Sequence, residues 1–513
     1  MILRDGGNQS VGVVLEAFES VHKAKGYFEA ALLRSLRRHW TFLVALLPLL
    51  GWWTYGLLDL DEGFYAAIAA EMNRRGEWIT PFYNGQPWFE KPILIYWLLK
   101  PSLWLFGDVV GPRVPSILAT VGLYVLCSWF AKRRLSEEAA RWMPLILGSS
   151  LVVVGTGRMV LTDPLLDLAM AGALLTFWES LVGDRRWRIV AAACLGFGVL
   201  AKGPVAGLLF LPIAGWTFWK QPDLRPAFRG GWLAGIVVFG LIVASWYVPC
   251  YLHNGHVFVQ DFLIDQNLKR FTGGDIAHTV PLYLGWPFYF LILLVGFAPW
   301  WFYIRPAWKQ ESGVGAYLKT WAAFIFIFFT LSGAKLPHYV LPAVPALALL
   351  VAAHLASVQK QPKRFLGWIA AAVIVAEGGF AGYYYGIPAF KLSGFHAEVH
   401  RLARYVREHA AATDQVAVYS MPRDKTLTNK PGTHLNETSH PSLLLYLDRD
   451  VIDTKSWEKL LHEKVPVWII TRWNRVQAAE RKAAGGRLHE VDPFPPDLYR
   501  LYKLDPAPTQ VAF

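Results

Sequence analysis

Long apolar runs separated by short polar segments dominate this chain. A helix needs about 20 apolar residues to cross the roughly 30 Å hydrocarbon core of a bilayer. Gly203 and Pro204 lie between two of the runs, where they either break one long helix or separate two short ones. The pattern predicts an all-α polytopic membrane protein with eleven spans, or up to thirteen, at 40–59, 113–131, 142–158, 165–182, 188–203, 204–219, 232–252, 281–304, 316–333, 339–357 and 365–386.

Basic residues occupy every second loop between these runs. They cluster at 34–38, 132–134, 185–188, 220–229, 305–319 and 360–364. Lys and Arg are enriched in the cytoplasmic loops of membrane proteins. We therefore expect a cytoplasmic N-terminus and an outer face formed by 60–112, 159–164, 253–280, 334–338 and the tail after about residue 387.

The tail alternates helical and extended patterns. A helical stretch at 396–411 precedes strand candidates at 416–419, 465–470 and 498–502. This alternation predicts a small α/β domain. We therefore divide the chain into a cytoplasmic segment 1–39, a transmembrane catalytic domain 40–386 and an outer α/β domain 387–513.

The first outer loop, 60–112, is too polar to span the membrane. Its segments 64–74 and 93–106 are typical of short helices that lie at the membrane surface. The functional chemistry is therefore expected beside the membrane on the outer side.

Composition agrees with the membrane class. Charged residues make up 17% of the 513 residues, against about 25% in soluble domains. The net charge of +12 lies largely in short loops, so membrane orientation explains it without a nucleic-acid partner. The three cysteines, Cys127, Cys194 and Cys250, fall in apolar segments without zinc-binding spacing, and we interpret them as buried apolar side chains.

Several ionisable residues lie beside the spans on the predicted outer face, where charge is costly and often functional. They are Asp61, Glu62, Glu90, Lys91, Arg158, Asp163, Lys202, Asp265, Lys269, Arg270, Lys335 and His338. Each one alone is explained equally by a surface anchor or a helix cap. As a set, they combine cations that suit a lipid-linked phosphate with carboxylates that accept a proton from a hydroxyl. No glycine-rich nucleotide loop occurs, so a nucleotide-sugar donor is not indicated.

The motifs of the first outer loop also resemble a known family. They are Asp61-Glu62-Gly63-Phe64-Tyr65-Ala66, Glu71-Met72, Gly76-Glu77-Trp78-Ile79-Thr80-Pro81, Asn84-Gly85 and Phe89-Glu90-Lys91-Pro92, followed by Tyr96-Trp97. This combination is similar to the aminoarabinose (4-amino-4-deoxy-L-arabinose) lipid A transferases. These are polyprenyl-phosphate-dependent glycosyltransferases of the GT-C fold, with protein mannosyltransferase relatives. The resemblance covers about residues 40–345, through 113–116, 162–164, 201–204, 267–271 and 332–342.

The resemblance implies transfer of a sugar from undecaprenyl phosphate to a periplasmic acceptor at the bacterial inner membrane. The acceptor would be lipid A, another cell-envelope glycan or a protein. Asp61 would be the catalytic or acceptor-positioning carboxylate, and Asp163 is a second catalytic candidate. The residues assigned to the donor phosphate are Lys91, Arg270, Lys202, Lys335 and Tyr339.

Other candidates would contact the acceptor or support the site: Glu62, Glu90, Tyr65, Asn267 and His338. Glu90 is also the one candidate metal ligand, although support of Lys91 explains it equally well. A lone interfacial His such as His338 is more often a hydrogen-bonded anchor. Fixed cations remove the need for a cofactor, and a divalent metal stays an open alternative.

The chain departs from the family pattern at three positions. Phe64 stands where the family often has Arg, Ile93 where it often has a second Pro, and Asn267 where aminoarabinose transferases tend to have His. These differences change which chemical groups of a substrate the site can bind. They bear on the sugar and the lipid A acceptor more than on the reaction class.

Two other classes compete with a transferase. A transporter or flippase of a lipid-linked sugar would use similar cations, but it would also need polar residues at mid-membrane and usually a repeated architecture. Neither is evident in the sequence. A scaffold that binds a partner through its outer domain would not need the charged set around Asp61. We expect a monomer that contacts membrane lipids, the lipid-linked donor and the acceptor, and no nucleic acid.

Overall fold

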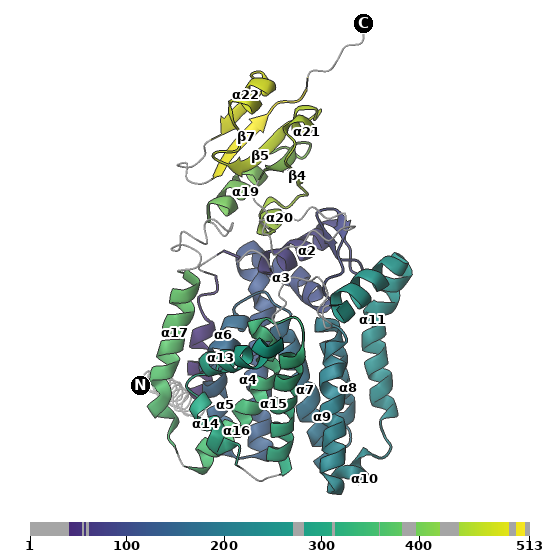
Figure 1. Cartoon of the computed structure of the whole chain (residues 1–513), viewed down its shortest axis with the longest axis vertical. Helices are drawn as coiled ribbons and strands as arrows, with labels where there is room; N and C mark the ends of the chain where they lie inside the picture. Colours follow the sequence, from purple (N-terminus) through teal and green to yellow (C-terminus); the bar gives the residue numbers. More distant parts are fainter. Residues whose placement is uncertain are drawn as a thin grey trace, which may run out of the picture.

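The chain consists of a helical bundle with a small mixed sheet above it (Figure 1). Helices α2 (Asp61–Arg75) and α3 (Leu94–Val110) lie between the two parts. The predicted segment 1–39 lies outside the described residues. The computed structural model describes residues 40–53, 56–57, 61–269, 282–309, 313–358, 360–381, 397–420, 441–491 and 499–507.

Helices long and apolar enough to cross a membrane form most of the bundle. Among the described residues, five helical segments meet this requirement, and seven do if each of two bent pairs is one span. The bent pairs are α5 (Glu137–Ser149) with α6 (Leu151–Gly157), and α13 (Gly285–Gly296) with α14 (Trp301–Ala307). The five segments are α3 with α4 (Val114–Arg134), α7 (Asp163–Val182), α11 (Leu233–Phe258) with most of η4 (Val259–Lys269), α15 (Gly313–Leu331), and η6 (Pro337–Ala343) with α16 (Val344–Ser357). The first is kinked at Gly107 and the third at Gly255.

The prediction of eleven spans is confirmed only in part. Each predicted range contains a helix or a bent pair, but four of the helices are too short to qualify. Three of them are α8 (Trp187–Lys202), α9 (Val205–Lys220) and α17 (Leu366–Ala381). Each has 16 residues, which extend about 24 Å. The first range, 40–59, holds only a short apolar helix at Trp40–Leu49, which ends in the turn η1 (Leu47–Leu49).

The junction between α8 and α9 resolves an alternative that the sequence left open. Gly203 has a φ of +82°, a conformation that favours glycine and ends α8. Pro204 then starts α9, and the two helices pack against each other. The segment is therefore two short helices rather than one long helix.

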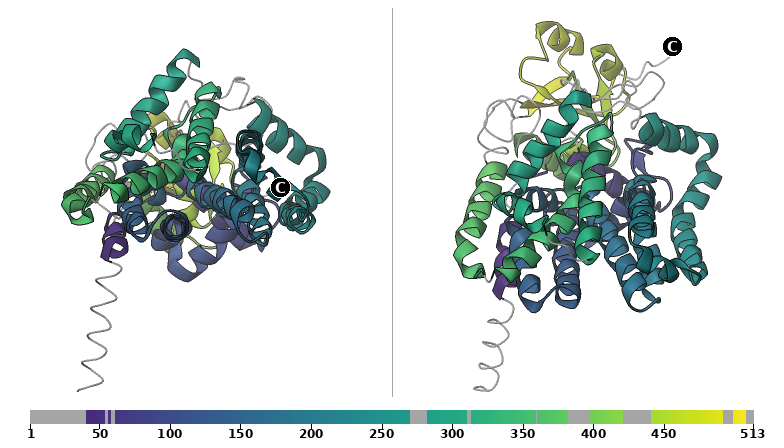
Figure 2. Two further views of the ribbon diagram at one scale, coloured as in Figure 1. Left: turned by 90° about the horizontal axis from the view of Figure 1, so that it is seen from below. Right: turned by 60° about the horizontal axis from the view of Figure 1, so that its bottom comes forward.

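The helices differ in how much of their surface is covered. Helix α7 is buried along almost its whole length, whereas only four residues of α11 are buried. Helix α11 stands at the edge of the molecule in Figure 1 and in the right-hand view of Figure 2. The remaining turns of the bundle are η2 (Gly111–Arg113), η3 (Pro222–Leu224), α10 (Arg225–Phe228), η5 (Leu282–Leu284) and η7 (Pro362–Phe365).

The two ends of the bundle carry different features. Helix α10 belongs to a predicted basic loop and lies at the end away from the sheet (Figure 1). The first outer loop lies at the sheet end, where α2, α3 and a small hairpin of β1 (Phe82–Tyr83) and β2 (Gln86–Pro87) are found. The two helices expected in this loop are confirmed.

The tail forms a five-stranded sheet in the order β4-β3-β5-β7-β6. Strand β3 is parallel to β4 and β5, and β7 is antiparallel to β5 and β6. The expected helix and three strands are confirmed, while β4 and β6, with three and four residues, had too little pattern to be predicted. The elements are α19 (Ala397–His409), β3 (Gln415–Tyr419), α20 (Ser442–Leu447), β4 (Ile452–Thr454), α21 (Trp457–Leu461), β5 (Val467–Arg472), α22 (Ala478–Ala484), β6 (Leu488–Val491) and β7 (Tyr499–Leu504).

A buried ion pair attaches α2 to the bundle. Arg113 donates from Nε and Nη2 to the two carboxylate oxygens of Glu62, each at 2.8 Å, and neither side chain is exposed. The Val160 N–H donates to the same carboxylate, also at 2.8 Å. The remaining Arg113 donors reach the carbonyls of Trp52 and Gly56 at 2.7 Å. Four separate segments therefore meet at this pair.

Replacing Arg113 by Ala should strongly destabilise the protein. The Glu62 carboxylate would remain buried without its cation, and breaking such a pair costs about 3–5 kcal/mol. Thermal unfolding of the detergent-solubilised protein measures the loss. Arg141→Ala is the matched control, because Arg141 pairs with Glu138 on the surface and should change stability by less than about 1 kcal/mol. Equal effects of the two substitutions would contradict the assigned role of the pair.

Candidate active site

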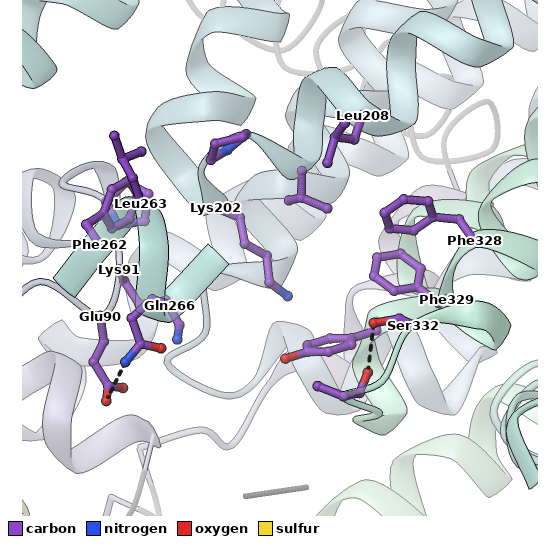
Figure 3. A pocket seen from close by; sticks show the side chains of 15 residues that line it. Glu90, Lys91, Lys202, Leu208, Phe262, Leu263, Gln266, Phe328, Phe329 and Ser332 are labelled. Carbon is purple, nitrogen blue, oxygen red and sulfur yellow. Dashed lines mark hydrogen bonds between the residues drawn. The ribbon is translucent and has the colours of Figure 1, made fainter. Parts of the chain in front are cut away.

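A pocket of about 340 Å³ opens between the first outer loop and helices of the bundle (Figure 3). Part of its lining is polar, from Glu90, Lys91, Lys202, Gln266, Ser332 and Tyr339. The rest is mainly apolar, from Val205, Leu208, Phe262, Leu263, Phe328 and Phe329. In Figure 3, Leu208, Leu263 and Phe328 lie toward one edge and Glu90, Gln266 and Ser332 toward the other. The pocket therefore suits an amphiphile with a polar head.

Lys202 projects into this pocket from the last turn of α8 (Figure 3). Its Nζ lies 2.5 Å from Oδ1 of Asp163 and 4.3 Å from the centre of the Tyr339 ring. A cation at a helix C-terminus interacts favourably with the helix dipole, and a cation above an aromatic ring gains further attraction. Lys202 is therefore held in place by three kinds of electrostatic contact.

Asp163 connects Lys202 to a second basic group. It begins α7 directly before Pro164, a proline position that favours helix initiation. Only 4% of its side chain is exposed, and Oδ2 lies 3.6 Å from Nε2 of His338. One carboxylate thus faces Lys202 from α8 and His338 from η6. These two basic residues are brought together although they are more than 100 residues apart in the chain.

Glu90 and Lys91 enter the pocket from the segment that follows β2. Glu90 accepts a hydrogen bond of 3.1 Å from Nε2 of Gln266, which belongs to η4 (Figure 3). The charge of Lys91 acts on both Asp163 and His338. The predicted first-loop motif and the predicted third-loop motif therefore meet at one pocket.

Asp61 and Tyr65 lie on the first turns of α2, near the same charges. Asp61 is exposed, and its charge acts on Tyr65 and on His338. Tyr65 is buried, and burial together with the negative charge of Asp61 raises the pKa of its phenol well above the usual value. The Tyr65 hydroxyl therefore stays protonated at neutral pH and can donate a hydrogen bond.

Three predicted candidates make contacts elsewhere. Glu62 is enclosed by its ion pair with Arg113 and is not in the lining of the pocket. Lys335 is also outside the lining, because its Nζ donates to the carbonyl of Ser332, and burial lowers its pKa. Arg158 donates to Pro48 and to the carboxylate of Glu377 at 2.9 Å.

Two candidates of the third outer loop are not placed in detail. Arg270 lies outside the described residues. Asn267 belongs to the π-helix η4, which also contributes Gln266 to the pocket, but its side chain is outside the described part of the structure. Their roles stay predictions from the family motif.

Possible metal ligands do not lie together in the described part of the structure. Among the described residues, no group of three or more His, Cys, Asp or Glu side chains is arranged to hold a metal ion. Glu90, the one candidate ligand, bonds to Gln266 instead of to another potential ligand. Its metal role stays a prediction from sequence.

One buried acid and the apolar walls of the pocket are not among the site residues that the sequence predicts. Asp167 lies one turn after Asp163 on α7, is 1% exposed, and has no hydrogen-bond partner among the described residues. An acidic residue inside the apolar run 165–182 was the available signal. Phe328 and Phe329 gave no such signal, because an apolar span does not reveal which of its faces lines a cavity.

The overall fold matches that of a solved protein. The crystal structure of ArnT from Cupriavidus metallidurans bound to undecaprenyl phosphate matches with a TM-score of 0.68 at 19% identity, over 94% of this chain and 98% of that protein. The apo structure matches with a TM-score of 0.66 over the same shares. The chain therefore has the ArnT-like GT-C fold that its motifs predicted.

The sequence of this chain resembles one family model and a group of curated relatives. Residues 37–258 match the family model for dolichyl-phosphate-mannose-protein mannosyltransferases. The undecaprenyl phosphate-alpha-4-amino-4-deoxy-L-arabinose arabinosyl transferase of Edwardsiella ictaluri is 32% identical over 57% of this chain and 54% of its own length. Transferase 1 of that name from Pseudomonas fluorescens is 33% identical over 60% and 57%. The matched region thus spans about half the length of these curated relatives, and the predicted resemblance to their family is confirmed.

The contact between Asp163 and Lys202 should appear as strong coupling in a double-mutant cycle. Asp163→Asn leaves the largely buried Lys202 without its carboxylate and should cost about 3 kcal/mol of stability. Adding Lys202→Met should cost less than the sum of the single substitutions, with a coupling of at least about 1 kcal/mol in thermal unfolding.

An exposed pair provides the matched control for this cycle. Lys132 and Glu137 are 2.9 Å apart, with side chains 51% and 58% exposed. Their substitutions should be additive within about 0.5 kcal/mol. Additive effects at Asp163 and Lys202 as well would contradict the proposed coupling.

Proposed function

We propose that this protein is an integral-membrane glycosyltransferase that moves a sugar from undecaprenyl phosphate to an acceptor at the periplasmic face of the inner membrane. The observation that carries the proposal is the pocket itself. Lys91 and Lys202 line it together with a run of Phe and Leu side chains. The names of the curated relatives, and the undecaprenyl phosphate bound to ArnT, support the same donor class.

The donor would bind with its phosphate between Lys91 and Lys202. The start of the polyprenyl chain would lie along Leu208, Phe262 and Phe328, where burial of apolar surface stabilises it. Tyr339 lies beside Lys202 and would close the phosphate site. Arg270 is proposed as a further cation from the family motif. Lys335 is a weaker candidate, because its amine already donates to a backbone carbonyl.

The reaction would be one direct displacement at the anomeric carbon of the sugar. The bond from this carbon to the phosphate oxygen breaks, and its electron pair leaves on undecaprenyl phosphate. A bond from the acceptor oxygen to the same carbon forms on the opposite face, so the configuration inverts. Fixed cations stabilise the negative charge that develops on the leaving phosphate. With Lys91 and Lys202 in this role, an obligatory metal is not part of the proposal.

Asp61 is proposed to act on the acceptor. If the acceptor is a hydroxyl, the exposed Asp61 carboxylate accepts its proton as the new bond forms. If the acceptor is a phosphate of lipid A, the nucleophile is already anionic, and Asp61 orients the reacting groups instead. Asp163 is proposed to act through Lys202 and His338, which it contacts directly.

Lipid A or another envelope glycan is the proposed acceptor, and a protein acceptor is the second candidate. The two curated relatives described above are named as aminoarabinose transferases, which favours the first candidate. The family model that matches residues 37–258 describes protein mannosyltransferases, which favours the second candidate. We propose a monomer with its N-terminus in the cytoplasm and with the pocket and the C-terminal sheet in the periplasm.

Asp61→Asn and Lys91→Ala should each reduce transfer of a labelled sugar from polyprenyl phosphate by at least about 100-fold in membranes. The first removes the group that acts on the acceptor, and the second removes a charge from the leaving phosphate. Lys132→Ala, an exposed cation paired with Glu137, should retain normal turnover. Near-normal turnover in both pocket variants would refute the scheme.

Mass analysis of a deletion strain should identify the acceptor class. The expected outcome is lipid A or an envelope glycan that lacks one sugar residue and regains it on complementation. Loss of a sugar from a protein alone would favour the protein acceptor. Accumulation of the lipid-linked donor on the cytoplasmic side, with no transfer by purified protein, would instead identify a flippase.

A further inference from the structure

The C-terminal sheet is joined to the hairpin of the first outer loop by two reciprocal hydrogen bonds. The Val451 N–H donates to Oδ1 of Asn84 at 2.8 Å, and Nδ2 of Asn84 donates to the Val451 carbonyl at 3.1 Å. Val451 lies directly before β4. Asn84 therefore pairs with the backbone of the C-terminal part in the way that a neighbouring strand would.

The hairpin has a conformation that presents Asn84 for this contact. Tyr83 pairs with Gln86, which leaves Asn84 and Gly85 as a two-residue turn. Their φ angles are +49° and +85°, as the tight hairpin turn favoured by Asn-Gly requires. The Gly85 N–H also donates to Glu71 at 3.0 Å, which fixes the turn against α2. The turn is therefore held from both sides.

Charged residues reinforce the same contact. Arg74 and Arg75, at the end of α2, both reach Asp450, at 2.6 Å and 3.4 Å. Asp450 directly precedes Val451. The residues just before β4 thus bind both the turn of the hairpin and the helix that supports it.

The segment from the hairpin to the pocket is short and tightly packed. After β2, the Trp88 N–H donates to the Pro81 carbonyl at 2.8 Å, and the Trp88 ring stacks on Phe64 at 5.2 Å. The next residue, Phe89, is 3% exposed and packs edge-on against Phe258. Glu90 and Lys91 follow at once. A shift of the hairpin would therefore be transmitted to the Lys91 side of the pocket.

We propose that the C-terminal part of the chain positions Lys91 for the anionic head of the lipid donor, and that Asn84 is the positioning residue through which it acts. Asn84 itself does not line the pocket. The inference rests on the proposed function for its ligand, undecaprenyl phosphate. It assigns a task to a part of the chain that contributes no residue to the lining of that pocket.

A second contact between the same parts provides a matched control. Asp108, near the end of α3, lies 3.4 Å from Arg404 and 3.8 Å from Arg407 of α19. This contact attaches the C-terminal part to α3 and does not involve the hairpin. Asp108→Asn should weaken attachment without moving Lys91.

The test compares Asn84→Gly with Asp108→Asn in the full-length protein. Glycine keeps the positive φ of the turn but removes both hydrogen bonds, so the backbone remains unstrained. We expect Asn84→Gly to weaken binding of undecaprenyl phosphate about five- to tenfold and to raise the donor KM similarly. Asp108→Asn should stay within about twofold of the wild type.

Hydrogen exchange of the segment 82–91 supplies a readout that needs no ligand. Asn84→Gly should exchange there at least about fivefold faster than the wild type, and Asp108→Asn should not. If exchange changes as expected but the wild type does not bind undecaprenyl phosphate, the proposed function is wrong. The contact by which Asn84 positions the segment 82–91 is then still supported. Equal effects of the two variants on exchange and on donor affinity, or none from Asn84→Gly, would overturn the inference.

Discussion

The buried pair of Glu62 and Arg113 is the interaction on which the arrangement of the outer face depends. Removing two charges from water is costly, and the cost is offset because both members of the pair make several further hydrogen bonds. The carboxylate takes two bonds from Arg113 and one from Val160, and the guanidinium also reaches two backbone carbonyls. Because Asp61 directly precedes Glu62, this pair also determines where the proposed acceptor carboxylate stands.

The pocket depends on a second constraint, the placement of charge at the ends of helices. Asp163 begins α7 and Lys202 ends α8, so each charge complements a helix dipole and each satisfies the other. The first residue of α7 and the last residue of α8 lie next to each other, so their charges meet. The apolar residues of both helices remain in the bundle. The lining therefore changes from Lys and Glu to Phe and Leu within one cavity. The ends of the helices account for the amphipathic character of the site.

Several residues that sequence motifs predict for the site lie around one pocket, but the motifs do not show how these residues contact one another. Lys91, Lys202 and Tyr339 were assigned to one phosphate site, and all three line the same pocket. Lys335 had an equally strong motif, yet its amine turns to the Ser332 carbonyl, because the backbone turn before η6 offers that partner. Glu62 and Asp61 are adjacent, but one is sealed by Arg113 and the other is exposed. Adjacent positions on a helix face different directions, and only packing decides which one is buried.

The sequence by itself determined the class of the fold, the apolar ranges and the motifs, because hydrophobic period, charge bias and local turn residues are encoded over short distances. Asn84-Gly85 specifies its hairpin in this way. Tertiary structure alone decided that α8 and α9 are separate short helices, that Phe328 and Phe329 face the pocket, and that Asn84 meets Val451. The last two outcomes join residues hundreds of positions apart, and all three depend on burial and partners that no local pattern records.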